Sequence, residues 1–315
     1  MNFWLIIKVL VTLFLFTMVY LSIDFNTTLT SLKNLSYGYF ILSIVVLTFQ
    51  TFVASIRWQK VLKSLNINLP YFKVVNFQWI AIFFNQTLPS SIGGDAFRAF
   101  YIHQEGFKVK QSLLGVLLDR YLGVIGLTTI VFFTIPLLFS LINDLAARRG
   151  IFLIATLMAF LILIVFIFDF LTFLKPRWRV IEQLHSISKD ARKIILTISP
   201  GISLVLISIL VHLLSVLSII ILSYGIQANI DWSQVLLIVP LTTLVMIVPI
   251  SIAGWGVREG MMVVGLGYMG VLKEEALALS LLYGFSMLIL SFPGLIMWFL
   301  RYRLVGKNLR NNKLS

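Results

Sequence analysis

Long uninterrupted apolar runs constrain this chain more than any other feature of its sequence. A helix of about 20 apolar residues crosses the hydrocarbon core of a bilayer, which is roughly 30 Å thick. Six runs of this length lie at residues 3–23, 37–56, 112–142, 151–174, 202–224 and 276–300. Only 12% of the 315 residues are charged, against roughly a quarter in soluble domains. The sequence therefore predicts an all-α polytopic integral membrane protein and excludes a water-soluble enzyme.

Two further apolar stretches, 74–92 and 235–252, are each interrupted by a proline and followed by glycines. Pro89 and Pro249 break a helix because proline lacks the amide donor and clashes with the preceding turn. We therefore predict that each stretch forms a broken, re-entrant hairpin, and that these two hairpins accompany the six transmembrane helices.

The distribution of basic residues predicts the orientation of the chain. Lysine and arginine accumulate in the connections that stay in the cytoplasm. They are abundant in 57–73, 175–200 and 301–315, whereas 24–36 and 225–234 together contain a single lysine. We therefore expect a multi-pass protein of the inner (cytoplasmic) membrane with both termini in the cytoplasm.

Two charge features complete this prediction. The net charge of +13 favours an anionic membrane surface as a partner over nucleic acid, because almost no part of the chain is soluble. Arg148 and Arg149 lie in a connection that this topology places outside. They fit the predicted orientation poorly, although Asp144 offsets part of their charge.

A displacement of 160 residues aligns two copies of one pattern in the chain. Five of ten positions match, with Pro89, Ser91, Ile92, Gly94 and Arg98 against Pro249, Ser251, Ile252, Gly254 and Arg258. Each half contains three spans, so the second half is expected to lie inverted relative to the first. Inverted repeats with paired proline and glycine breaks are typical of transporters that bind their substrate near the membrane midplane.

This repeat divides the chain into three expected parts. Residues 1–145 form the first repeat, with its hairpin at about 74–106. Residues 146–300 form the second repeat, with its hairpin at about 235–272, and 301–315 form a basic cytoplasmic tail.

Three motifs resemble a known family. They are NQTLPSSIGGDAFRAF at 85–100, the pair Asp119 and Arg120, and PISIAGWGVREG at 249–260. Together they resemble the flippase-like membrane region of lysylphosphatidylglycerol synthases and their stand-alone relatives. The resemblance implies a protein that handles lipids or lipid-linked glycans. Full synthases add an aminoacyl-transferase domain, which we expect to be absent because the chain ends fifteen residues after its last predicted span.

Six ionisable residues fall within or beside the hairpins and the third span. They are Asp95, Arg98, Asp119, Arg120, Arg258 and Glu259, and their charges sum to zero. Each costs about 2.5 to 3.5 kcal/mol at the membrane centre, so they must face inward and pair. Asp95 and Arg98 share one helical face. Arg258 and Glu259 are adjacent and are expected to point apart, and Asp119 is expected to pair with Arg98 or Arg258.

These residues support two interpretations. Arg98 and Arg258 can hold one phosphate of a lipid headgroup, or all six charges can form a structural ion-pair network. Gly93, Gly94, Gly254 and Gly256 are likewise open to two interpretations. They can expose amide groups to an anion or permit close helix packing.

The remaining polar residues predict neither a cofactor nor a metal site, because the three histidines lack ligand spacing and the chain has no cysteine. His212, in the middle of a span, is expected to hydrogen-bond a neighbouring helix. A homo-oligomer is possible on this sequence.

Three functions remain open. The first is a flippase or transporter for a phospholipid or lipid-linked saccharide, driven by an ion gradient or downhill flow because the chain has no phosphate-binding P-loop motif. The second is a membrane-embedded enzyme that modifies a lipid headgroup, with Asp95 or Glu259 as general base. The third is a partner subunit that transports nothing.

Overall fold

The computed structural model describes residues 3–21, 23–88, 93–168, 188–190, 192–193, 198–248 and 250–311. Within these ranges the regular elements are helices and no strand occurs. They are α1 (Phe3–Leu21), α2 (Phe25–Lys33), α3 (Tyr37–Ser64), α4 (Tyr71–Thr87), α5 (Gly93–Gln104), α6 (Val109–Leu141), α7 (Leu145–Ile167), α9 (Ile198–Gly225), α10 (Trp232–Met246), α11 (Val257–Gly267) and α12 (Lys273–Asn311). The predicted all-α class is confirmed.

Among the described residues, five helices are long and apolar enough to cross a membrane. They are Tyr37–Ser64, Val109–Leu141, Leu145–Ile167, Gly201–Gly225 and Lys273–Arg301, which correspond to five of the six expected spans. The sixth expected span, 3–23, is also helical as α1 but is not among these five. The count of six spans therefore stays a prediction.

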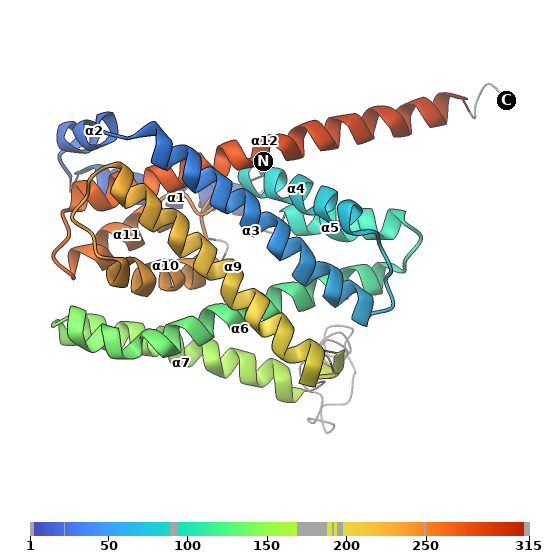
Figure 1. The fold of residues 1–315 in the computed structure, drawn as a ribbon, viewed down its shortest axis with the longest axis horizontal. Coiled ribbons are helices and arrows are strands. Elements are labelled where there is room, and N and C mark those ends of the chain that lie inside the picture. The colour runs from blue at the N-terminus through green and yellow to red at the C-terminus, as the bar shows by residue number, and fades with distance from the viewer. Residues whose placement is uncertain are drawn as a thin grey trace.

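The first pair of short helices, α4 and α5, forms a hairpin whose two outer ends meet. Lys73, in the first turn of α4, forms a 2.6 Å ion pair with Glu105, the residue after α5. Pro89 lies outside the described residues, in the connection between the two helices. In Figure 1 this hairpin lies toward the end of the bundle from which the C-terminus leaves.

The second pair, α10 and α11, closes in the same way but without charges. Gln234 Nε2, near the start of α10, donates a 3.0 Å hydrogen bond to the carbonyl oxygen of Met269, beyond the end of α11. Pro249 is outside the described residues. Figure 1 places this hairpin toward the opposite end of the bundle from the first. Re-entry into a membrane from opposite sides, like the inverted repeat, stays a prediction.

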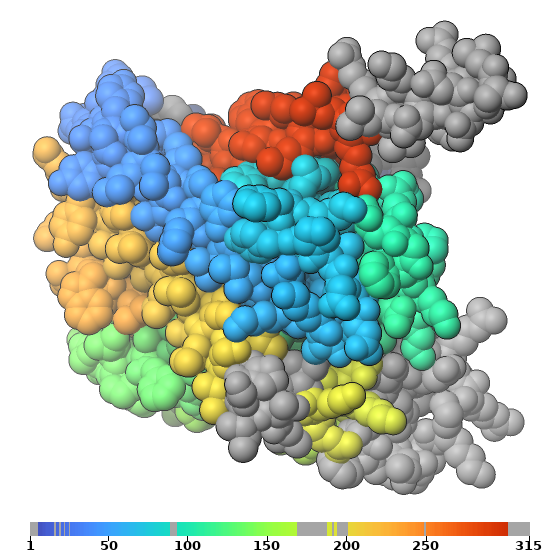
Figure 2. All heavy atoms as spheres, turned by 45° about the vertical axis from the view of Figure 1, so that its right-hand side comes forward, coloured from blue at the N-terminus to red at the C-terminus, as the bar shows by residue number. Residues whose placement is uncertain are grey.

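The long helices hold the two hairpins together. Helix α3 packs along α9, and Figure 2 shows α3 bordered by α4 and α9 on one face of the molecule. Helix α12 contacts both α4 and α11, so it touches a member of each hairpin. Helix α7 packs on α6 at the edge of the bundle, and Ala155 is its one buried residue in the described part of the chain.

Two expected boundaries change, and one expected segment lies mostly outside the described residues. The span predicted at 151–174 corresponds to α7, which starts at Leu145 and ends at Ile167. Most of the basic segment 175–200 lies outside the described residues. The helix predicted to end at residue 300 continues to Asn311, so the first part of the basic tail is helical.

Candidate functional site

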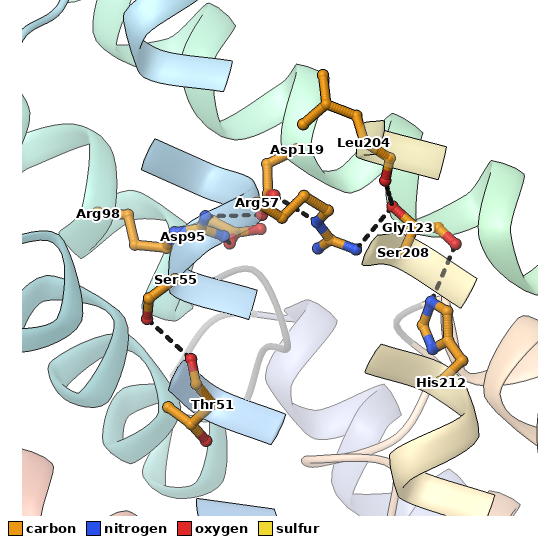
Figure 3. A network of polar contacts seen from close by, with 10 residues as sticks. All are labelled: Thr51, Ser55, Arg57, Asp95, Arg98, Asp119, Gly123, Leu204, Ser208 and His212. Carbon is orange, nitrogen blue, oxygen red and sulfur yellow. Dashed lines mark hydrogen bonds and ion pairs between the residues drawn. The ribbon is translucent and has the colours of Figure 1, made fainter. Parts of the chain in front are cut away.

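The first group of charged residues is built around Asp119, on α6. Its two carboxylate oxygens accept hydrogen bonds from two arginines on different helices (Figure 3). Arg57 Nε on α3 lies 2.8 Å from Oδ1, and Arg98 Nη2 on α5 lies 2.7 Å from Oδ2. All three residues are buried. Asp119 therefore links the first hairpin to α3 and α6.

Asp95 extends this group at the start of α5. Arg98 Nη1 lies 3.4 Å from Asp95 Oδ1, and Arg120 Nε contacts Asp95 Oδ2. The pairing of Arg98 with Asp95 is as the sequence predicts, and of the two partners expected for Asp119, Arg98 or Arg258, it is Arg98 that pairs with it. The guanidinium of Arg98 also lies over the ring of Trp58, with Cζ 3.8 Å from the ring centroid. Both terminal nitrogens of Arg98 are thus engaged within the protein.

Arg57 is a member of this group that the sequence analysis missed. It was assigned to the cytoplasmic segment 57–73, but α3 continues to Ser64 and buries it. Its Nη1 donates a 3.2 Å hydrogen bond to Ser208 Oγ on α9. The signal in the sequence was the absence of a helix breaker between residues 56 and 64. With Arg57 included, three arginines face two aspartates, so the first cluster carries a net charge of +1.

His212 lies close to this cluster on α9. Its Nε2 is 3.0 Å from the carbonyl oxygen of Gly123 on α6 (Figure 3). The prediction that His212 hydrogen-bonds a neighbouring helix is therefore confirmed. The contact ties α9 to α6 one turn from Asp119.

The second group of charges lies at the start of α11, and it corrects one expectation. Arg258 and Glu259 do not point apart: Nη2 and Nε of Arg258 lie 2.6 and 3.0 Å from Glu259 Oε1. Their side chains can meet because Glu259 turns back to its helix N-terminus, where Oε2 accepts a 2.6 Å hydrogen bond from the Gly256 amide. Ser280 on α12 donates to the same Oε1 at 3.2 Å. Asp119 pairs with Arg98 and Arg57 and not with Arg258.

A cavity of about 210 Å³ opens beside Arg258. Its polar lining consists of Gln86, Thr242, Thr243, Arg258, Ser280 and Tyr283. The Oγ1 atom of Thr242 is buried without a hydrogen-bond partner in the described residues. Nη1 of Arg258 likewise has no hydrogen bond within the described part of the chain. The cavity therefore offers an anion the guanidinium of Arg258 as a donor.

The glycines at matching repeat positions serve different purposes. A Cβ on Gly94 would lie 2.1 Å from the carbonyl oxygen of Ala81, so this position needs a close approach of α5 to α4. Gly254 has φ of +79° and follows Ala253, which lines the cavity with φ of +50°. The amides of Gly94 and Gly256 are already bonded, to Asn85 Oδ1 and to Glu259. A Cβ on Gly93 would meet the flexible side chain of Leu88.

Long apolar helices around two buried charged clusters define a multi-pass helical membrane protein. A family model, described as the lysylphosphatidylglycerol synthase TM region, matches residues 5–294. The chain belongs to this family, as the resemblance in its motifs implies. A UPF0104 membrane protein of Pyrococcus horikoshii is 28% identical over 144 residues. This alignment covers 45% of the chain and 42% of the relative.

Proposed function

We propose that the chain is a flippase-like transporter for a phospholipid or a lipid-linked glycan. The single observation that carries this proposal is the cavity at Arg258, a space inside the bundle lined by a guanidinium whose Nη1 has no hydrogen bond among the described residues. Buried ionisable residues within membrane helices are functional sites by default. Membership of a family named for a lipid synthase's membrane region is consistent with a lipid as substrate.

The cavity suits a phosphate with an apolar chain attached. Glu259 and Ser280 hold the guanidinium of Arg258 in place, so its remaining nitrogen is presented with little loss of side-chain entropy. Three methionines, Met246, Met262 and Met287, line the same space. Methionine side chains adapt to irregular apolar ligands. We therefore assign the headgroup phosphate to Arg258 and the adjoining apolar atoms to the methionines.

The arrangement of the two hairpins supports alternating access in this proposal. They lie toward opposite ends of the bundle (Figure 1), and α12 contacts both. Gln86, near the end of α4, lines the cavity that is otherwise formed by the second half. Movement of one half against the other would therefore change the cavity. That Arg98 shares the phosphate with Arg258 stays a prediction, because its two terminal nitrogens bond carboxylates in this state.

Reconstitution of the full chain into liposomes with labelled lipids tests the proposal. We expect Arg258→Lys to slow leaflet exchange about 10- to 100-fold, since loss of a charged hydrogen bond costs about 1.5 to 3 kcal/mol. Lys33→Arg, which also exchanges one basic residue for the other but at an exposed position at the end of α2, is the matched control and should exchange lipid like the unchanged protein. Unchanged leaflet distribution across a panel of phospholipids and lipid-linked sugars would contradict transport.

Lipid profiling of a deletion strain separates the alternatives. Loss of a lipid species would favour an enzyme that modifies headgroups over the transporter. Normal species with altered exposure between leaflets are the result expected here. A partner subunit would change neither quantity. In this proposal the protein lies in the inner membrane with both termini in the cytoplasm.

A further inference from the structure

Arg148 and Arg149 are a charged pair that neither the predicted topology nor the proposed transport explains. Both line a groove of about 510 Å³ between the end of α6 and the start of α7. The groove is otherwise mainly apolar, lined by Phe139, Leu145, Phe152, Leu153 and Thr156. It does not share a lining residue with the cavity at Arg258. Two guanidinium groups thus adjoin an apolar surface at a second place in the molecule.

The two arginines have different tasks within this groove. Arg148 is fixed, because Nη2 donates a 2.7 Å hydrogen bond to the carbonyl oxygen of Phe139 and Nε contacts the carbonyl oxygen of Ile142. It therefore caps the end of α6 while keeping Nη1 unbonded in the described part of the chain. Arg149 is exposed and forms neither a hydrogen bond nor an ion pair with the described residues.

The nearest carboxylate does not neutralise this pair. Asp144 is the N-cap of α7, and its Oδ1 accepts a 2.6 Å hydrogen bond from the Ala147 amide. It has no ion pair with either arginine in the described residues. The groove therefore has an excess of positive charge at its rim. A ligand that complements it must carry negative charge.

The apolar part of the groove indicates where that ligand lies. Of the described helices, α6 is the main one that α7 packs against. Phe152 and Leu153 are 53% and 68% exposed. Leu145–Ile167 is also one of the helices long and apolar enough to cross a membrane, and in such a span we infer that this apolar surface faces hydrocarbon. The arginines lie in its first two turns, at the end of a helix that would meet the lipid headgroups if it spans the membrane. A ligand with an anionic group at the rim and an alkyl chain along the helix is an anionic lipid.

We propose that this groove binds one anionic phospholipid. The phosphate contacts Arg149 and the unbonded nitrogen of Arg148, and an acyl chain lies against Phe152 and Leu153. Its volume is within the usual range for ligand sites, about 300 to 1,000 Å³. This lipid is a bound structural ligand, separate from any lipid transported through the cavity at Arg258. The proposal also accounts for two arginines in a connection that is otherwise expected to face away from the cytoplasm.

Native mass spectrometry of the full chain in mild detergent tests this site. Phosphatidylglycerol and phosphatidylcholine with identical acyl chains are the probes. We expect preferential retention of phosphatidylglycerol, and a decrease of about fivefold in Arg149→Gln, since one basic residue near anionic lipid contributes about 1 kcal/mol. Arg149→Lys should retain most of the preference. Lys33→Gln, which removes an exposed base at the end of α2, is the matched control and should bind as the unchanged chain does.

Two further arms identify the ligand. Leu153→Gln should weaken retention of the phospholipid, because the acyl chain loses its apolar contact, whereas excess glycerol phosphate should not displace it. Displacement by glycerol phosphate would identify a site for free phosphate and overturn the lipid assignment. The proposal is also overturned if Arg149→Gln and Lys33→Gln have equal effects, or if the chain is a dimer that carries no lipid. These experiments do not measure transport. Their outcome therefore neither supports nor contradicts the function proposed for Arg258.

Discussion

The arginines of the repeated pattern occupy matching places in the chain but different surroundings. Arg98 bonds carboxylates on two helices and lies over Trp58, so its two terminal nitrogens are satisfied. Arg258 bonds the neighbouring Glu259 and lines a cavity, with Nη1 unbonded in the described residues. One motif thus supports an internal ion-pair network in the first half and an available donor in the second.

The residues around each arginine explain this difference. The 160-residue displacement that aligns Arg98 with Arg258 places Trp255 at the position of Asp95 and Ser280 at that of Arg120. Asp95 bonds Arg98, whereas Trp255 presents its ring 4.6 Å from the Arg258 guanidinium carbon. Replacing an acid by an aromatic ring keeps a favourable contact with the cation. It leaves the hydrogen-bond donors free to bond other groups.

The largest expected effect is on stability, from Asp119→Asn. This change leaves both Arg57 and Arg98 buried without their common carboxylate, and breaking a buried pair costs about 3 to 5 kcal/mol. Glu259→Gln should lower the free energy of unfolding by less, because the arginine that loses its carboxylate, Arg258, lies beside a cavity. Thermal unfolding of the purified variants in detergent measures both.

The control for this comparison is Glu275→Gln, a partly exposed acid that forms no ion pair with the described residues. It should lose at most about 1 kcal/mol, the usual contribution of an acid in the first turn of a helix. Equal losses of stability in Asp119→Asn and Glu259→Gln would show that both clusters are equally important to the fold. That result would contradict the difference proposed between the two halves.

A smaller difference is expected between the two arginine-to-lysine changes. Arg98→Lys should lower stability by about 1 to 3 kcal/mol, because one ammonium cannot reach two carboxylates in the geometry of a guanidinium. Arg258→Lys should unfold closer to the unchanged chain while losing transport. Thermal unfolding and lipid exchange are measured on the same preparations. If instead Arg98→Lys is stable and Arg258→Lys is unstable, then the structural role belongs to the cluster of Arg258, and the contrast proposed here is wrong.

The sequence predicts the helical class, the long spans and the breaks between the short helices, because apolar run length, proline and glycine act locally. It also predicts the pair of Asp95 with Arg98, and it limits the partner of Asp119 to Arg98 or Arg258 without choosing between them. It could not predict that Arg57 is buried. A basic residue near the end of a span is normally assigned to the cytoplasmic connection, and only the observed length of the helix shows otherwise. Nor could it predict the contact of Arg258 with Glu259, which depends on Glu259 turning back to the Gly256 amide.

The aligned glycines provide a third comparison. Gly94→Ala places a methyl group against the Ala81 carbonyl, and Gly254→Ala forces alanine to a φ of +79°. Each is expected to cost about 1 to 3 kcal/mol, by overpacking against backbone in the first case and mainly by backbone strain in the second, where the added Cβ meets only the flexible end of Met246. Asparagine separates the causes, because it tolerates positive φ. Gly254→Asn should therefore unfold above Gly254→Ala, whereas Gly94→Asn should be at least as unstable as Gly94→Ala.

The smallest expected effect distinguishes the contacts that close the two hairpins. Burial raises the pKa of Glu105, but hydrogen bonds and charges from Lys73 and Arg301 outweigh burial and hold this pKa below its usual value. The carboxylate therefore stabilises the fold above the unfolded pKa of about 4.3 and loses this effect as the pH falls through the lowered folded value. Gln234, which closes the second hairpin, does not titrate.

This difference is measurable as a pH dependence of two variants. At neutral pH, Glu105→Gln should lose at most about 1 kcal/mol, because Lys73 is partly exposed and solvent weakens the pair. That loss should shrink toward zero in acid, where Glu105 is protonated in the unchanged chain as well. Gln234→Leu should be destabilised equally at every pH. If the loss in Glu105→Gln is the same at neutral and acid pH, then packing around the side chain stabilises the first hairpin, and the charge of Glu105 does not.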